Sequence, residues 1–301
     1  MKFLDRACPI CFVDSESRVW APENFDFSKL GEYAFASRKT PEYMHYRIHH
    51  CHCCHVLYSS PIPESNYIAH TYHEAAFDSK EEADRASLTY AKLLPTISNE
   101  IKQINSALDI GTGEGSFLER LLDFGFKEVK GIEPSTAAIN AARPRVKQNI
   151  IHSFFKKESF AKDTFDLITC FQTLEHLEKP TEFVESIHEI LRPGGCFYTV
   201  CHNYKAFSTK ILGLKSPIFD IEHMQLFSPK GMHVLLTKCG YENISIQPIF
   251  NSYPLYYWIK LFPMPLAFKK MLLNKIFSPL LKKIIIKIPA GNFYALAYKK
   301  K

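Results

Sequence analysis

The 301-residue chain lacks any run of eighteen apolar residues, the length that a membrane-spanning helix requires. It also lacks the continuous apolar stretch of a signal peptide, because the opening MKFLDRACPICFVDSESR places acidic residues and cysteines there. No internal repeat and no low-complexity tract occurs. Since 46% of the residues are hydrophobic, the chain can bury a core. We therefore expect a globular, cytoplasmic protein without a membrane span.

Acidic residues are absent after Glu242, whereas the last 59 residues hold ten lysines. The first 242 residues carry a net charge of −4 and the last 59 carry +10. The asymmetry centres on residues 252–289, an insertion between the last two expected strands that mixes lysine with aromatic and aliphatic residues. This composition favours either peripheral contact with an anionic membrane, at the inner membrane surface, or a lid over an apolar acceptor. The alternative is a set of helices that pack on the core with their lysines in solvent.

Prolines interrupt this insertion, so it cannot form one continuous helix. They lie at Pro263, Pro265 and Pro279. Read as a helix, only residues 280–288 keep their lysines on one side; these are Lys282, Lys283 and Lys287.

Nine cysteines divide into two groups, with five in the first 54 residues and four, Cys170, Cys196, Cys201 and Cys239, set singly in apolar surroundings where burial is expected. An odd, clustered count in a chain without an export signal favours metal binding over disulfides. Cys8 and Cys11 form one C-x-x-C pair, and Cys51 and Cys54 form a second. Four thiolates suit tetrahedral zinc and leave no coordination position open. The sequence therefore predicts a structural zinc site in a module spanning residues 1–62.

The positions after the two pairs depart from the usual pattern of a zinc knuckle. Glycine is common just after the second cysteine, where φ is positive, but Phe12 and His55 stand there. Because phenylalanine is poorly suited to that conformation, we expect a distorted first knuckle, with Cys53 or His52 as competing ligands. Positive charge near the module is sparse, so we expect no nucleic-acid partner.

From residue 106 onward, short apolar runs alternate with amphipathic segments. Strands are expected at 106–110, 128–132, 165–171 and 195–200, and helices at 116–124, 135–143, 180–191 and 228–240. Such alternation predicts an α/β fold with parallel strands and crossover helices. Two later strands, at 242–250 and 292–300, complete the expected sheet.

The loop after the first of these strands is rich in glycine. In ALDIGTGEGSF (107–117), Gly111, Gly113 and Gly115 let the backbone turn sharply and approach a ligand closely. A dinucleotide fingerprint would need glycine at position 116, where Ser116 stands. Asp109 would repel a pyrophosphate but suits a ligand with ammonium and sulfonium groups.

This D-x-G-x-G-x-G pattern resembles motif I of class I S-adenosylmethionine-dependent methyltransferases. The resemblance continues through VKGIEPS (129–135), FDLITCFQTLEHLEKP (165–180) and ILRPGGCFYTVCHN (190–203). It implies a Rossmann-like, seven-stranded sheet with its last strand antiparallel, within a domain at 63–301. The N-terminal segment resembles the zinc-ribbon module that precedes some class I methyltransferases, including sugar C-methyltransferases.

The resemblance also assigns residues to the binding of S-adenosylmethionine. Asp109 and the three glycines belong to motif I, Glu133 corresponds to the acidic residue that binds the ribose hydroxyls, and Gln172 follows the fourth strand. Where many relatives have an acidic residue for the adenine, this chain has Phe154 and Phe155. Aromatic packing on the adenine by Phe154 is expected, and the alternative is that both rings belong to the core.

Two histidines fall where the resemblance places the mouth of the active site. His223 is the preferred general base and His176 the second candidate, since histidine accepts protons near neutral pH. Alternatively, each only orders its loop. Tyr67 and Tyr72 are candidates for a lid over the cofactor.

The predicted function is methyl transfer from S-adenosylmethionine to a small, sugar-linked or lipid-linked acceptor. The first alternative is a catalytically silent module that binds the cofactor. The second is an NAD-dependent oxidoreductase, which Asp109 and Ser116 disfavour.

Overall fold

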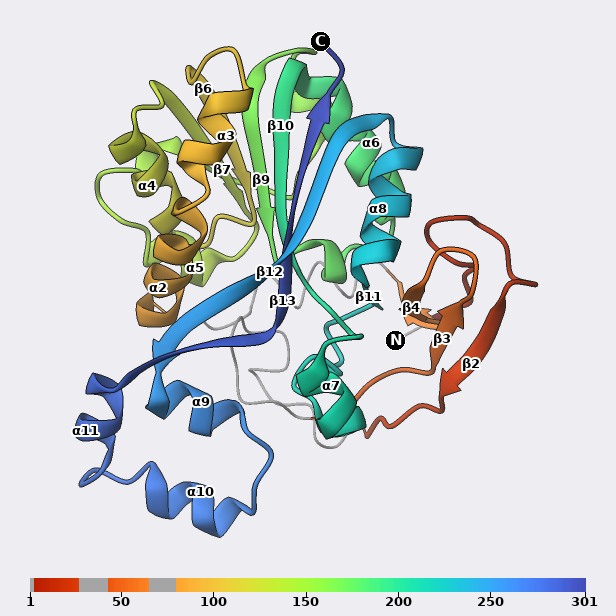
Figure 1. Ribbon diagram of the computed structural model, residues 1–301, viewed down its shortest axis with the longest axis vertical. Helices are drawn as coiled ribbons and strands as arrows, with labels where there is room; N and C mark the ends of the chain where they lie inside the picture. Colours follow the sequence, from red (N-terminus) through yellow and green to blue (C-terminus); the bar gives the residue numbers. More distant parts are fainter. Residues whose placement is uncertain (1–2, 27–42, 65–79) are drawn as a thin grey trace.

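The computed structural model describes residues 3–26, 43–64 and 80–301, and its centre is a seven-stranded sheet (Figure 1). The strands are β6 (Ser106–Ile110), β7 (Glu128–Glu133), β8 (Ile150–His152), β9 (Phe165–Phe171), β10 (Leu191–His202), β12 (Tyr241–Pro254) and β13 (Ile285–Lys299). Their spatial order is β12-β13-β10-β9-β6-β7-β8. Strands β8, β7, β6, β9 and β10 are parallel, and β13 is antiparallel to both of its neighbours. The expected Rossmann-like α/β sheet with an antiparallel last strand is therefore confirmed.

Helices cover both faces of this sheet. One face carries α2 (Lys80–Ala91), α3 (Leu94–Glu100) and α4 (Ser116–Phe124), and the other carries α6 (Pro180–Ile190) and α8 (Pro229–Lys238) (Figure 1). Each face has its own hydrophobic core. In β6, Ala107 belongs to the core on the side of α2, α3 and α4, whereas Leu108 belongs to the core on the side of α6 and α8. All five β6 residues are buried, as expected for a parallel strand with helices on both faces.

The strand order places a ligand site at one edge of the sheet. The chain runs outward from β6 to β7 and β8, and then returns to β9 on the other side of β6. At such a switch point the loops after the two strands diverge and leave a crevice at their carboxyl ends. The glycine loop follows β6 and Gln172 follows β9, so both lie at this crevice.

Strands β12 and β13 extend beyond the sheet as a two-stranded ribbon (Figure 1). The ribbon ends in α9 (Leu255–Leu261), α10 (Leu266–Leu272) and α11 (Ser278–Lys283). Within residues 280–288 the helix ends at Lys283, and residues 285–288 pair with 251–254 in the ribbon. None of the helices in the described ranges has the length and apolar character that crossing a bilayer demands.

The N-terminal segment forms a small sheet that the rest of the chain completes. Strands β2 (Ser17–Ala21), β3 (Ile48–Cys51) and β4 (Val56–Ser59) are antiparallel, and β11 (Gln225–Leu226) pairs with β4 at the edge. A separate pair joins β1 (Phe3–Leu4) to β5 (Ile62–Pro63). The segment that precedes α8 is thus hydrogen-bonded directly to the cysteine-rich segment.

Two buried polar side chains join these parts of the molecule. Gln225 donates from Nε2 to the carbonyl oxygens of Leu174, at 2.5 Å, and Leu177, at 2.8 Å. Arg6 donates from Nη2 to Gln225 Oε1 at 3.1 Å and from Nη1 to the Glu178 carbonyl oxygen at 2.8 Å. Buried polar groups cost free energy unless they are paired. These contacts therefore fix the N-terminal segment against the loop after β9 and the segment before α8.

Candidate functional site

The glycine loop between β6 and α4 has a left-handed backbone at all three glycines. Their φ angles are 77° at Gly111, 58° at Gly113 and 83° at Gly115. A Cβ atom at Gly111 would lie 2.5 Å from Thr173 Oγ1, so this glycine allows close packing. A Cβ atom at Gly113 would have no atom within 4 Å, so this glycine borders open space. The loop therefore leaves room for a ligand at its centre.

Two buried carboxylates flank the loop. Glu133, at the end of β7, accepts hydrogen bonds from the backbone N–H groups of Gly113 and Ser135, both at 2.8 Å. Asp109, at the end of β6, accepts a hydrogen bond from Thr169 Oγ1 at 2.6 Å. Burial raises the pKa of Glu133, and it raises the pKa of Asp109 to about 6. A cationic ligand would stabilise the ionised forms of both groups.

The residues expected to meet the rest of a cofactor lie around the same loop. Gln172 has a φ of 50° and donates its backbone N–H to the Val200 carbonyl oxygen at 2.7 Å, which places it at the end of β9. Phe154 is 36% exposed, whereas the ring of Phe155 packs edge-on against that of Phe183, 5.1 Å away. Phe155 therefore belongs to an aromatic cluster, and Phe154 is a partly exposed ring in the cavity wall.

One cavity of about 970 Å³ runs from the glycine loop to the elements at the far end of the ribbon. Its lining includes Asp109, the loop glycines Gly111 and Gly113, Glu133, Phe154 and Gln172, together with His176, His202 and His223. Its volume lies at the upper end for sites that hold one drug-sized ligand, so two reactants fit better than one. Acidic side chains line it at six positions, Asp109, Glu114, Glu133, Glu178, Asp220 and Glu222, and no lysine or arginine of the described ranges does so.

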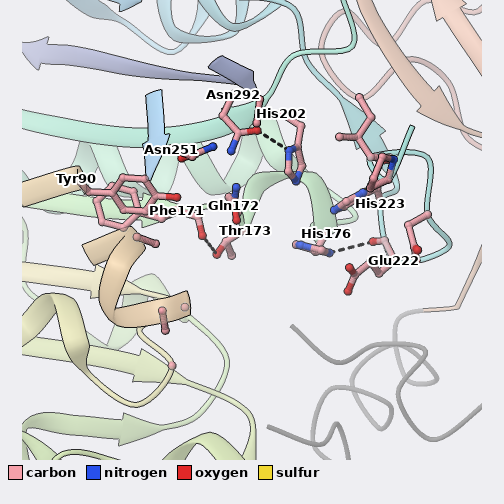
Figure 2. Close-up of a pocket in the computed structure, with 18 of the residues that line it drawn as sticks. Tyr90, Phe171, Gln172, Thr173, His176, His202, Glu222, His223, Asn251 and Asn292 are labelled. Carbon is pink, nitrogen blue, oxygen red and sulfur yellow. Dashed lines mark hydrogen bonds between the residues drawn. The ribbon is translucent and has the colours of Figure 1, made fainter. Parts of the chain in front are cut away.

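Three histidines from separate elements meet in this cavity (Figure 2). The ring of His223 lies 4.8 Å from that of His176 and 5.1 Å from that of His202, measured between centroids. Nδ1 of His223 is 2.8 Å from the Ile218 carbonyl oxygen, and Nδ1 of His176 is 3.1 Å from the Glu222 carbonyl oxygen. Because a carbonyl oxygen only accepts, both rings carry a proton on Nδ1, and in the neutral form of each ring Nε2 is the acceptor nitrogen.

His202 was not among the candidates that the sequence suggested. It ends β10, and its backbone N–H donates to Glu175 Oε1 at 2.7 Å. Its Nδ1 is 2.8 Å from Asn292 Oδ1, on β13. Burial lowers the pKa of His202 to about 4, so its ring is neutral at pH 7. The only local signal was a histidine at the carboxyl end of a buried strand, and Asn292 lies 90 residues further along the chain.

The lid candidates Tyr67 and Tyr72 lie outside the described residues.

The four cysteines predicted as ligands come together in the N-terminal module. The Sγ atoms of Cys8, Cys11, Cys51 and Cys54 all lie within 4.8 Å of one another, whereas Cys53 is exposed and outside the group. The sulfurs of Cys11 and Cys51 lie 3.6 Å apart, which is too long for a disulfide. This donor set fits a tetrahedral zinc ion.

The first knuckle is not distorted, contrary to the expectation from Phe12. Phe12 and His55 both adopt a positive φ, at 63° and 53°. Their backbone N–H groups donate to the carbonyl oxygens of Cys8 and Cys51, each at 2.9 Å. The ring of Phe12 lies under the Lys238 ammonium, 4.2 Å from its centroid, and this contact offsets part of the backbone strain.

Sequence comparison agrees with the sheet and the glycine loop. A family model described as a methyltransferase domain matches residues 80–246, more than half of the chain. Ubiquinone biosynthesis O-methyltransferases of Coxiella burnetii and Aromatoleum aromaticum are each 32% identical to the chain, over 133 and 134 residues. The matches cover 42% of this chain and 53% and 54% of those proteins, so the chain spans about half the length of the curated relatives.

Structural comparison supports the same fold. The YcgJ protein of Bacillus subtilis superposes with a TM-score of 0.51 at 17% identity, covering 71% of this chain and 99% of that one. A Bacillus halodurans protein superposes equally well, at 16% identity and with 70% and 99% coverage. From the family match over residues 80–246, the chain belongs to the methyltransferase-domain family, and its sheet is the Rossmann-like one of class I S-adenosylmethionine-dependent members.

Proposed function

We propose that the protein transfers a methyl group from S-adenosylmethionine to a hydroxyl-bearing acceptor that lies in the same cavity. The observation that carries this proposal is the continuity of the cavity, which joins the glycine loop and Glu133 to three histidines. A module that only bound the cofactor would not need basic groups at the far end of the cavity. A pyrophosphate-bearing nicotinamide cofactor suits the acidic lining poorly, since like charges repel strongly at low dielectric.

For the cofactor, we assign the end of the cavity nearest the glycine loop. Gly113 leaves open space, Glu133 lies beside it for the ribose, and Phe154 offers an aromatic face for the adenine. Asp109, Gln172 and Gly111 complete the wall. Gly115 does not line the cavity; its left-handed backbone turns the loop into α4, close to Val146. S-adenosylmethionine, when bound, supplies an electrophilic methyl group, and the acidic lining complements its positive charge.

For the acceptor, we assign His223 as general base and His176 as its neighbour. The tautomer of both rings leaves Nε2 as the proton acceptor. His223 would take the hydroxyl proton as the oxygen–methyl bond forms and the sulfur–methyl bond breaks, with S-adenosylhomocysteine as the leaving group. The walls of the cavity would exclude water. The histidine pair thus performs the proton transfer that an oxygen acceptor requires.

For the metal, we propose one structural zinc ion held by Cys8, Cys11, Cys51 and Cys54. Burial raises the pKa of the Cys8 thiol to about 12, so a divalent cation is needed to hold the buried cluster as thiolates. Cys51 ends β3, and β4 follows it directly and pairs with β11. The metal module of residues 1–62 therefore supports the segment that carries His223.

For the acceptor class and the site of action, we favour a lipid-linked acceptor over a sugar-linked or small soluble one, reached from the cytoplasmic surface of the inner membrane. Helices α7 (Phe207–Leu212), α9, α10 and α11 gather at one end of the molecule (Figure 1). Apolar side chains project from it, including Phe207, at 77% exposed, and Ile276, at 80%. Phe207 and Phe262 also line the cavity, so this apolar end borders the acceptor site.

The pKa of Asp109 gives the binding of S-adenosylmethionine a pH dependence. The cation favours the ionised carboxylate, whose pKa in the free protein is raised to about 6, so affinity should fall as pH drops through 6. At pH 5 we expect binding about tenfold weaker than at pH 7.5, by titration calorimetry. Asp109→Asn should bind S-adenosylmethionine more weakly at pH 7.5 and should show no further fall in affinity at pH 5. Asp123→Asn, on the exposed face of α4, should show the same fall in affinity as the unaltered protein. An equal affinity at both pH values in the unaltered protein would contradict the role of Asp109.

Removal of the base should slow transfer without weakening cofactor binding. His223→Phe is expected to reduce the rate of label transfer from methyl-labelled S-adenosylmethionine into cell extract by about 10²- to 10⁴-fold. Its affinity for S-adenosylhomocysteine should remain within about twofold of the unaltered protein, because His223 lies at the acceptor end. His233→Phe, on the exposed face of α8, is the matched control. A larger loss in His176→Phe than in His223→Phe would transfer the assignment to His176.

The metal assignment predicts different behaviour for two adjacent cysteines. The purified protein should contain about one zinc ion per chain by elemental analysis, and Cys54→Ser should lose it and melt at a lower temperature. Cys53→Ser, which alters an exposed thiol outside the cluster, should keep both the zinc and the melting temperature. Full metal content in Cys54→Ser would refute the four-cysteine site.

The apolar end predicts reversible binding to anionic lipid. At low salt the protein should sediment with vesicles of phosphatidylglycerol and phosphatidylcholine, and not with phosphatidylcholine alone. Replacing Lys282, Lys283 and Lys287 by glutamine should weaken binding more than tenfold, since each lysine near the surface contributes about 1 kcal/mol. The same triple change at Lys127, Lys130 and Lys147, on the opposite part of the sheet, should have little effect. Failure to sediment with anionic vesicles would exclude membrane contact.

A further inference from the structure

The polar end of the cavity is built by an irregularity in the β12–β13 ribbon. Ile249 pairs with Asn292 and Asn251 with Ile288, so one residue on β12 faces residues 289–291 on β13. The extra residues are held from outside the ribbon, because the Asn203 N–H donates to the Gly291 carbonyl oxygen at 2.8 Å. The bulge places the side chains of Asn251 and Asn292 in the cavity, with Asn292 beside His202 and Asn251 farther along the same wall, toward Gln172 (Figure 2).

The hydrogen bonds at this end leave two acceptor atoms for a ligand. Asn292 Oδ1 takes the proton of His202 Nδ1, so Nε2 of the neutral ring has a lone pair and no hydrogen-bond partner among the described residues. Asn251 is 3% exposed, and its Oδ1 likewise has no partner in the described ranges. An unpaired buried acceptor costs about 1–3 kcal/mol. A ligand group that donates hydrogen bonds, such as a hydroxyl, would remove that cost.

The charges of the cavity restrict the ligand further. Its wall has acidic residues at six positions, and no lysine or arginine in the described part of the chain contributes to it. A carboxylate or phosphate would have no cation to pair with and would be repelled, since buried charges require partners. The group bound here is therefore not an anion, and a neutral hydroxyl can satisfy the two acceptor atoms.

The walls next to these polar groups are apolar. Helix α7 contributes Phe207 and Ile211, and α9 contributes Trp258 and Leu261. Trp258 is fixed by a hydrogen bond from Nε1 to the Ile286 carbonyl oxygen at 3.1 Å. A ligand with its hydroxyl at Asn251 would place its remaining atoms against these side chains.

We infer that His202, Asn251 and Asn292 form a subsite for the hydroxyl of an uncharged acceptor, whose apolar body lies between α7 and α9. This inference rests on the proposed methyl transfer, because the subsite and the cofactor end belong to one cavity. It restricts the acceptor to hydroxyl compounds with an apolar body and excludes acceptors whose phosphate or carboxylate lies at this end.

The test measures binding of three model compounds to protein saturated with S-adenosylhomocysteine. They are 4-hexylphenol, its methyl ether 4-hexylanisole and the anion 4-hexylbenzoate. The chain has two tryptophans, so Trp20→Phe leaves Trp258 as the only fluorescent reporter. In that background we expect the phenol to bind about tenfold more tightly than either of the others. A preference for the benzoate, or equal binding of phenol and ether, would overturn the inference.

Substitution of Asn251 then identifies the atom responsible. Asn251→Leu should bring the ratio of phenol to ether affinity down to about one, whereas Asn251→Asp, which retains an acceptor oxygen, should preserve it. Asn140→Leu, at an exposed position at the end of α5 (Thr136–Asn140), is the matched control and should keep the full ratio. Retention of the ratio in Asn251→Leu would refute the subsite.

The affinity for S-adenosylhomocysteine, measured separately, distinguishes failure of the proposed methyl transfer from failure of the subsite. If neither the unaltered protein nor any variant binds S-adenosylhomocysteine, the proposed function fails. If it binds normally but the phenol is not preferred, the proposed function stands and the inference alone fails.

Discussion

The buried side chain of Gln225 is the contact on which the arrangement of the acceptor end depends. Its amide donates to the turn that carries His176, its backbone pairs with β4, and its oxygen accepts from Arg6. His223 lies two residues earlier in the same segment. One amide therefore couples the histidine pair to the cysteine cluster, since Cys51 and Cys54 lie at the turn between β3 and β4. A metal ion held by the four cysteines would thus influence the geometry of the site without any role in the chemistry.

A second constraint acts from the other end of the chain. The β12–β13 ribbon must both close the sheet and carry α9, α10 and α11, and the bulge at residues 289–291 is where it bends away. Because β-bulges redirect neighbouring side chains, the same irregularity that directs the ribbon outward also sets Asn251 and Asn292 beside His202. The apolar helices and the polar subsite thus follow from one local change in register.

The sequence predicted those parts of the site that depend on local pattern. The three glycines, Asp109 and Glu133 lie at strand ends that the alternation of apolar runs already located, and the two C-x-x-C pairs needed only their spacing. The sequence did not predict that His202, Asn251 and Asn292 share the cavity, because this depends on strand pairing across 90 residues and on a bulge. Pro289 and Gly291, whose φ is 102°, were the local signals of that bulge. The lysine spacing of residues 280–288 fits a helix, but pairing with 251–254 makes residues 285–288 part of a strand. Phe12 is a case in which intrinsic preference gave the wrong prediction. Phenylalanine rarely adopts a positive φ, but here it does so while its ring contacts the Lys238 ammonium.

The central claim is that one cavity brings S-adenosylmethionine to an acceptor with an apolar body. The most direct test is to incubate the protein with methyl-labelled S-adenosylmethionine and cell extract, and to partition the products between organic and aqueous phases. The account predicts protein-dependent label in the organic phase, in a compound that carries a new methyl ether. Label confined to the aqueous phase would contradict the apolar acceptor, and absence of label despite cofactor binding would contradict methyl transfer itself.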